Sequence, residues 1–411
     1  MHERDQSNHH AFFLFMFPVF SMRSVIEIMV KGVKTSKLWP VLLLALSASA
    51  AAPPAERVVQ AEMSAIDFSG IQGFLNGLDQ EIRPYMPDYR PNSDGGGGFD
   101  PGLLVKRILN NLLSELALNA HLLGELVFLA VLCALLSHLS GSFASQNVSQ
   151  LAFYVCYLVM MGLAAKSFFT SIQLGRAAVD NMANLMYAML PVVCSLLAAV
   201  GAAATSVIFH PLMIGAVTVI ARLVQTVVFP LAILTMLVTL VGHLAEGFSL
   251  SKLASLLKTV TIGFTGLLLA GFVGLISVRG VAAAAADGVG LRTAKYVSGT
   301  FVPIVGKGMS DAMDTVAGCS LLLKNTIGGF GAWSLIVLVA FPLVKILVLV
   351  GIYRLAAALV QPLGENRLVE ALNAIGGGFT VIFAVTALIG LAFFLGLTIL
   401  VALGNLSYAL R

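Results

Sequence analysis

The chain has 411 residues, of which 58% are hydrophobic and only 11% are charged, and its mean hydropathy is +0.95. A soluble domain cannot bury that much apolar surface, so the composition excludes an ordinary globular protein. The net charge of +4 is a weak excess without a basic cluster, which excludes nucleic acid as an expected partner. We therefore predict an all-α, polytopic transmembrane helical bundle surrounded by membrane lipid.

The N-terminal region matches the pattern of a cleavable secretory signal, preceded by an extension that a signal does not need. Residues 29–52 contain three lysines, a short apolar run and an Ala-x-Ala site that ends at Ala50. We predict cleavage after Ala50 or Ala52, which places the mature N-terminus outside the cytoplasm. Residues 1–28 are interpreted as an upstream extension that results from a mis-assigned start codon.

An extracytoplasmic segment, residues 53–120, is expected to follow the signal. Prolines and a run of glycines make its first part a linker, and residues 101–118 then follow a helical apolar period. Lys106, Arg107 and Glu115 fall off the apolar face, which predicts an amphipathic helix on the membrane or on the bundle. A plain solvated lead-in to the first span is the alternative.

Seven apolar blocks have the length of membrane-spanning helices, at about 20 residues each. They cover residues 122–139, 151–172, 186–209, 212–241, 261–278, 333–360 and 380–403. The first two blocks form a pair within 121–185. With the mature N-terminus outside, the long loop after the fifth block is expected on the cytoplasmic side, which the positive-inside rule favours because of its Lys and Arg residues.

Two similar stretches, 186–285 and 298–404, indicate an internal repeat of three-segment units. Pro191 and Phe229-Pro230-Leu231 recur 112 residues later, and Lys252-Leu253 and Gly263-Phe264-Thr265 have counterparts 115 residues later. If all three segments of each unit cross the membrane, the second unit is inverted, the spans number eight and the C-terminus lies outside. If the segment after Pro303 does not cross, the spans number seven and the C-terminus is cytoplasmic.

The two copies differ most in the segment that follows the proline. The first copy is almost wholly apolar there, whereas the second holds Lys307, Asp311 and Asp314 after Pro303. On a helix these three side chains fall within about 60° of one another and form one polar stripe. Because ionisable groups are costly at membrane depth, the stripe indicates a lining of a wet cavity. The alternative is an interfacial helix or loop with an ordinary surface salt pair.

Arg222 and Lys345 lie deep inside their apolar blocks and are further candidates for facing the bundle interior. The equally open alternative is that each side chain reaches for a lipid headgroup. The histidines and the four cysteines are scattered, and no phosphate-binding loop, nucleophile elbow or metal motif is present in the sequence. We therefore expect no enzymatic activity, no cofactor and no metal site.

Two runs of residues carry a family resemblance. FVPIVGKGMSDAMDTVAGCSLLLKN at 301–325 and FDPGLLVKRILNNLLSEL at 99–116, together with the signal and the order of spans, resemble the stage III sporulation protein AE family. The resemblance implies a multi-pass subunit of the channel complex through which the mother cell sustains the engulfed forespore. It implies a place in the outer forespore membrane, beside other subunits of that complex, and carries over no catalytic residues.

Two other functions stay open from the residues alone. An autonomous secondary transporter of a small solute is favoured by the possible inverted repeat. A membrane scaffold that only recruits other subunits is favoured by the sparse charge within the apolar blocks.

Overall fold

The computed structural model describes residues 66–86 without 79 and 81, 101–140, 146–244, 250–301, 305–364 and 366–409. Within these ranges some side chains are not described, among them those of 291–301 and 305–313. The chain divides into two units, Met1–Pro54 and Ala55–Arg411, and the description below concerns the second. The expected upstream extension, the signal with Ala50 and Ala52, and Pro303 lie outside the described residues.

The described residues are helical and contain no strand, which confirms the predicted all-α class. The elements are α4 (Ser69–Asn76), the 3-10 helix η1 (Arg83–Tyr85), α5 (Pro101–Leu118), α6 (Ala120–Ser140), α7 (Gln146–Ala199), α8 (Ala203–Leu223), the π-helix η2 (Val224–Val228), α9 (Phe229–Leu244), α10 (Ser251–Phe301), α11 (Val305–Val360), the 3-10 helix η3 (Gln361–Leu363) and α12 (Asn366–Ala409).

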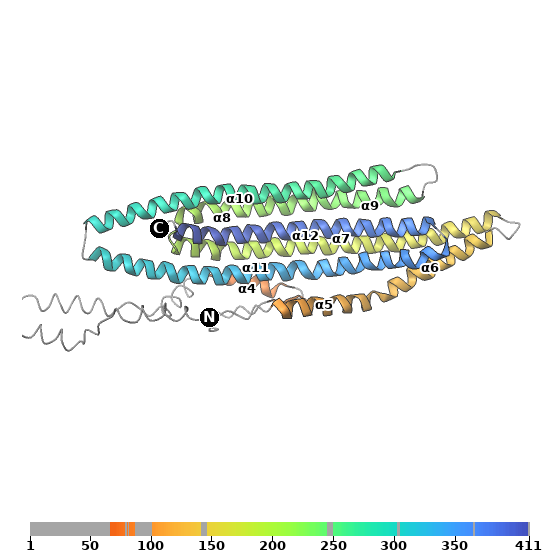
Figure 1. Cartoon of the computed structure of the whole chain (residues 1–411), viewed down its shortest axis with the longest axis horizontal. Coiled ribbons are helices and arrows are strands. Elements are labelled where there is room, and N and C mark those ends of the chain that lie inside the picture. Colours follow the sequence, from red (N-terminus) through yellow and green to blue (C-terminus); the bar gives the residue numbers. More distant parts are fainter. Residues whose placement is uncertain are drawn as a thin grey trace, which may run out of the picture. The chain divides into compact units, whose positions relative to one another are not determined.

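Long helices lie lengthwise beside one another and alternate in direction (Figure 1). α8, η2 and α9 run one way and α10 returns beside them, which makes a first hairpin. α11 and α12 make a second hairpin, in which Gly328 faces Val401 and Gly390 faces Val339. The residue numbers therefore rise along one helix as they fall along the other.

The expected seven or eight spans are wrong for the described residues. Five helices are long and apolar enough to cross a membrane, or six if α5 and α6, which meet at a bend of 42°, count as one span. The block at 186–209 is not a span, because α7 ends at Ala199 and α8 begins at Ala203 within it. Gly201 makes that turn with φ 94°, a left-handed conformation that suits glycine.

Two expected loops are helical instead. Residues 173–185, expected to join the second and third blocks, lie in the middle of α7, and the loop expected after the fifth block is the continuation of α10 followed by the first turns of α11. Charged residues lowered the local hydropathy in both places, although the helices continue through them.

The second copy of the proposed repeat is not inverted relative to the first. α10 and α12 begin at Ser251 and Asn366, 115 residues apart, which is the offset of the matched residues. Phe272 meets Phe393 and Gly280 meets Leu403, so the two helices run in the same direction. The repeat itself stays a prediction.

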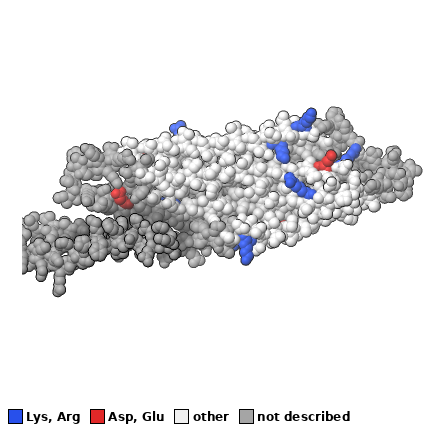
Figure 2. Space-filling view, viewed as in Figure 1, with Lys and Arg blue, Asp and Glu red and all other residues white. Residues whose placement is uncertain are grey.

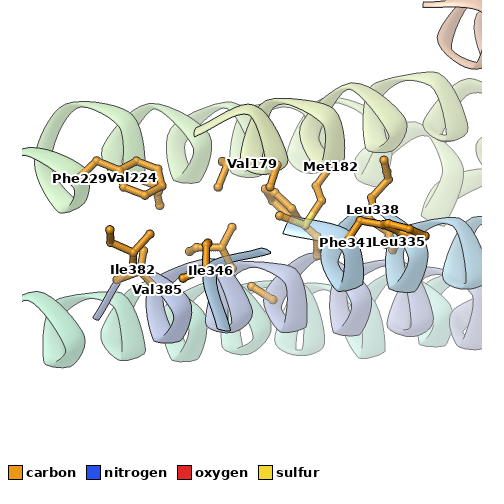
Figure 3. Packing of buried hydrophobic residues seen from close by; sticks show 14 of the residues in the cluster. Val179, Met182, Val224, Phe229, Leu335, Leu338, Phe341, Ile346, Ile382 and Val385 are labelled. Carbon is orange, nitrogen blue, oxygen red and sulfur yellow. The ribbon is translucent and has the colours of Figure 1, made fainter. Parts of the chain in front are cut away.

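The core lies between α7, α10, α11 and α12 and is almost wholly apolar. Figure 3 shows side chains from α7, η2, α9, α11 and α12 that point toward one another, among them Val179, Val224, Phe229, Ile346 and Val385. Each of these residues is at most 1% exposed. The helical period places these residues on the inward face of their helices.

Candidate functional site

Two helices carry apolar segments of matching length that define a level for the bilayer. Residues 259–278 of α10 contain no charge and lie between Lys258 and Arg279. Residues 325–344 of α11 also contain no charge and lie between Lys324 and Lys345. Each segment has 20 residues, and at 1.5 Å per residue it spans about 30 Å, the thickness of the hydrocarbon layer.

The two charge-free segments lie at the same level on either side of α12, which contacts an end of each (Figure 1). Gly280, next to Arg279, meets Leu403 of α12. Lys324 Nζ donates hydrogen bonds to Val401 O at 2.7 Å and to Asn405 Oδ1 at 2.9 Å. Arg279 and Lys324 therefore lie level with one another. On the face shown in Figure 2, most of the described charged side chains gather toward one end, beyond a broad uncharged band.

α7 crosses the same layer in one antiparallel register with α11. Gly331 meets Met189, and Tyr353 Oη donates to Ser167 Oγ at 3.2 Å. In this register Asp180 is level with Ala340. Asp180 thus lies about 7 Å inside the layer, measured from Lys345. A carboxylate at that depth is costly unless it meets a partner or water.

The π-helix η2 lies opposite Asp180 and directly precedes a proline-containing turn. Pro230 is the second residue of α9 and has no N–H to donate to the preceding turn. The helix there widens, and Phe229 N donates to Val224 O, five residues back. Phe229 is fully buried beside Gly175, where a Cβ would approach the ring to 3.0 Å. A side chain at position 175 would require Phe229 to shift by a few tenths of an ångström, so the glycine permits this close approach.

A cluster of polar side chains, hereafter the polar layer, surrounds η2. It consists of Arg176 and Asp180 of α7, Arg222 of α8 and Gln225 of η2. The Gln225 amide donates to Asp180 Oδ1 at 3.0 Å and to Arg176 O at 3.2 Å. One turn before Gln225, Arg222 is level with residue 337, about 12 Å inside the layer, because Tyr187 and Thr218 pair in the same register.

Among the described residues, the charges of the polar layer are incompletely paired. The Arg176 guanidinium carbon lies 5.8 Å from the Phe229 ring centroid, and its Nε is buried without a hydrogen-bond partner. Asp180 and Arg222 are both exposed and form no ion pair with each other. An exposed charge at the centre of the bilayer costs about 2.5 to 3.5 kcal/mol on insertion scales, and Arg222 lies close to that depth. The polar layer is therefore the best candidate for a functional contact.

The structure separates the residues that the sequence singled out. Arg222 belongs to the polar layer but is exposed on the outer surface and does not face the interior. Lys345 is largely buried at one edge of the hydrocarbon layer. Asp314 is half-buried near the start of α11; the side chains of Lys307 and Asp311, and all of Pro303, lie outside the described residues.

Lys345 fastens the amphipathic helix α5 to the bundle. Its Nζ lies 3.4 Å from Glu115 Oε1, and the two side chains are 23% and 11% exposed. Tyr85 packs against Phe341 with ring centroids 4.4 Å apart and ring planes tilted by 43°, and Arg107 lies over Tyr85. α5 thus lies on the bundle, which is one of the places predicted for the amphipathic helix. The expectation that Glu115 points off the packed face is wrong, because the ion pair draws it inward.

The sequence analysis did not identify two buried charged residues. Lys324, expected in a loop, is 0% exposed and bonds to α12. Asp287 is 6% exposed and accepts hydrogen bonds from Ala204 N at 2.8 Å, Thr205 N at 3.0 Å and the Thr205 hydroxyl. It caps α8 from another helix, so no local capping pattern was available to reveal it.

The sequence analysis also did not identify Arg176 and Asp180 as candidate site residues, because they were assigned to a loop. A signal was present in the sequence: Val179, Met182 and Met186 recur at helical spacing on one buried face of α7. The polar layer offers one carboxylate, two guanidinium groups and an amide, which suit pairing with charged or polar groups. No cluster of three His, Cys, Asp or Glu residues suited to a metal occurs within the described ranges.

Comparisons with known proteins agree on one family. The family model described as stage III sporulation protein AE matches residues 88–404. The chain is 35% identical over 365 residues to "Stage III sporulation protein AE" of Bacillus subtilis (strain 168), which covers 88% of this chain and 92% of that protein. No solved structure matches the chain.

Proposed function

Because this chain belongs to the stage III sporulation protein AE family, we propose that it is a multi-pass subunit of the channel complex between mother cell and forespore. In this proposal it lies in the outer forespore membrane, contributes a pore-like element and acts together with other stage III sporulation subunits. The chain has the long apolar helices of a membrane protein, in agreement with such a place.

The observation that carries the proposal is the polar layer at membrane depth on the outer surface. Lipid tails offer no partner for Asp180 or Arg222, so these side chains call for protein or water beside them. The helices also exceed the bilayer: α10 exposes large apolar side chains from Leu253 to Val289, about 54 Å apart along the axis. A lone subunit would leave that excess apolar surface in water.

Forespore gene expression tests this proposal. Asp180→Asn and Arg222→Gln together should reduce late forespore gene expression at least tenfold while the protein still accumulates in the membrane. A fluorescent fusion should surround the engulfed forespore in both strains. Normal expression in the double variant, at normal protein level, would overturn the proposal that this layer serves the complex.

The stripe after Pro303 is a second proposed contact of the same subunit. We propose that Lys307, Asp311 and Asp314 line a wet cavity. Asp311→Ala with Asp314→Ala should then abolish forespore development without loss of the protein, and Lys307→Ala should be milder because a lysine stem reaches water elsewhere. Normal sporulation of the double variant would leave the stripe as an interfacial surface.

The scaffold alternative keeps support, because the polar layer faces outward, where a recruited subunit would bind. If the chain acts only as a scaffold, neutralising the stripe of Lys307, Asp311 and Asp314 should leave its function intact, whereas a pore-like subunit should lose its function. The autonomous transporter loses its main support, since the matched helices α10 and α12 run in the same direction.

A further inference from the structure

We propose that the outer face of α7 and α8 binds the same face of a second copy of this chain, with Asp180 of each copy paired to Arg222 of the other. The face is defined by Gln173, Asp180 and Asn184 of α7, Val219 and Arg222 of α8, and Thr226 of η2. All six residues are exposed.

Polarity at depth argues against lipid as the occupant. Gln173, Asp180 and Asn184 recur at helical spacing on one side of α7, and Asp180 and Asn184 lie inside the level set by Lys324 and Lys345. Hydrocarbon cannot hydrogen-bond to amide and carboxylate groups. Elsewhere at this level the exposed residues of α10 are apolar or small, as at Leu267 and Leu275, and suit lipid.

Charge complementarity selects a second copy. Asp180 and Arg222 have opposite charges, lie on one face and form no ion pair with any residue that the structure describes. A two-fold axis along the membrane normal keeps each residue at its own depth and brings each face against itself. Asp180 and Arg222 are level with residues 340 and 337, which differ by about 4.5 Å along the axis. An arginine side chain spans that offset.

The same arrangement explains why Gln225 holds Asp180. Its amide donates to Asp180 Oδ1 and leaves the second carboxylate oxygen for a partner. Thr226 Oγ1 donates to Arg222 O at 2.7 Å, so the hydroxyl is satisfied within its own helix and does not compete for the carboxylate. The face thus presents one acceptor and one guanidinium group to the other copy.

Charge exchange between two tagged copies tests the pairing in the full chain. Asp180→Arg and Arg222→Asp, each expressed alone, should lower co-capture of differently tagged copies from solubilised membranes at least tenfold. The two variants expressed together should capture one another as the unaltered chains do, because each supplies the charge that the other needs. Asp180→Arg combined with Arg222→Asp in one chain should also recover self-capture.

Arg279→Asp is the matched control, because Arg279 is an exposed arginine at the edge of the layer on α10. Its capture should not change. Self-capture of the single variants at the unaltered level overturns the proposal. So does failure of the mixed pair when both chains accumulate, since the charges would then pair within one copy or with a different protein.

Cross-linking tests the face without any change of charge. In a chain whose four cysteines, which are all free, are replaced by alanine, Val219→Cys should form a disulfide-linked dimer in native membranes. Val278→Cys on α10 is the control, because Val278 is 72% exposed against 56% for Val219. A dimer at residue 278 and none at residue 219 overturns the proposal.

Discussion

In each hairpin one buried charged side chain joins the two helices, and the two charges have opposite signs. In the first, Asp287 of α10 accepts hydrogen bonds from the N-terminus of α8; in the second, Lys324 of α11 donates to a carbonyl in the last turns of α12. Both contacts lie near the end where α8 begins and α12 ends (Figure 1). The anion meets the positive N-terminal end of α8, as the helix dipole favours, whereas the cation bonds to a carbonyl about two turns before the C-terminal end of α12.

The same tripeptide has different consequences in the two hairpins. Phe229-Pro230-Leu231 follows a π-helix, whereas Phe341-Pro342-Leu343 lies within the continuous helix α11. Pro230 is exposed and Pro342 is buried, with Phe341 covered by Tyr85. Proline removes one backbone donor in both places. The tertiary surroundings then decide whether the helix widens, so the sequence motif alone does not fix local geometry.

Removal of the first buried charge should have the largest effect. Asp287→Leu leaves two backbone N–H groups and the Thr205 hydroxyl without their acceptor. We expect a loss of about 3 kcal/mol in the free energy of unfolding in mixed detergent. Asp287→Asn keeps one acceptor oxygen and should lose about 1 kcal/mol. Equal stability of the Leu variant and the unaltered chain would contradict the capping role.

Removal of the second buried charge should cost less. Lys324→Met keeps the apolar stem and removes donors to Val401 O and Asn405 Oδ1. The carbonyl sits in a helical turn and Asn405 is exposed, so water can replace the lost donor there. We expect a loss of about 1.5 kcal/mol by the same measurement. If Lys324→Met destabilises the chain more than Asp287→Leu does, the comparison of the hairpins fails.

The sequence predicted the helical class and the amphipathic helix α5. These features are local, since they depend on the apolar period and on residues close in the chain. The family also followed from two runs of residues, at 99–116 and 301–325, before any structural detail was used.

The sequence could not give the turn at Gly201 or the contacts of the buried charges. The turn lies inside an apolar block, so hydropathy shows no interruption there, and its stabilising acceptor Asp287 is more than 80 residues away. Arg176 and Asp180 led to the opposite error. They lowered the hydropathy in the middle of a continuous helix, which was therefore predicted to be a loop. Contacts between helices determine both the turn and the continuous helix, and the linear pattern of hydropathy does not reveal these contacts.

The ion pair that fastens α5 to the second hairpin should have a smaller effect. Glu115→Gln removes the charge opposite Lys345 but can keep a hydrogen bond. Because both side chains are partly open to solvent, we expect a loss of about 1 kcal/mol or less. Labelling of a cysteine at Leu112, which is half-buried on α5, should become faster. Unchanged labelling would show that the contact of Tyr85 with Phe341 holds this region.

The prolines should affect geometry more than stability. Pro230→Ala restores the missing N–H, so the π-helix can become an α-helix and turn Gln225 away from Asp180. In the unaltered chain the Gln225 amide nitrogen lies 3.0 Å from Asp180 Oδ1. Cysteines at these two positions should be joined severalfold less efficiently by a short bifunctional cross-linker after the change. Pro342→Ala is the matched control and should leave this cross-link unchanged, because α11 is already regular there. We expect either substitution to change the unfolding free energy by about 1 kcal/mol or less, since each exchanges a ring contact for a backbone hydrogen bond. If Pro230→Ala leaves the cross-link intact, the widened turn is set by the packing of Phe229 against Gly175 rather than by the proline.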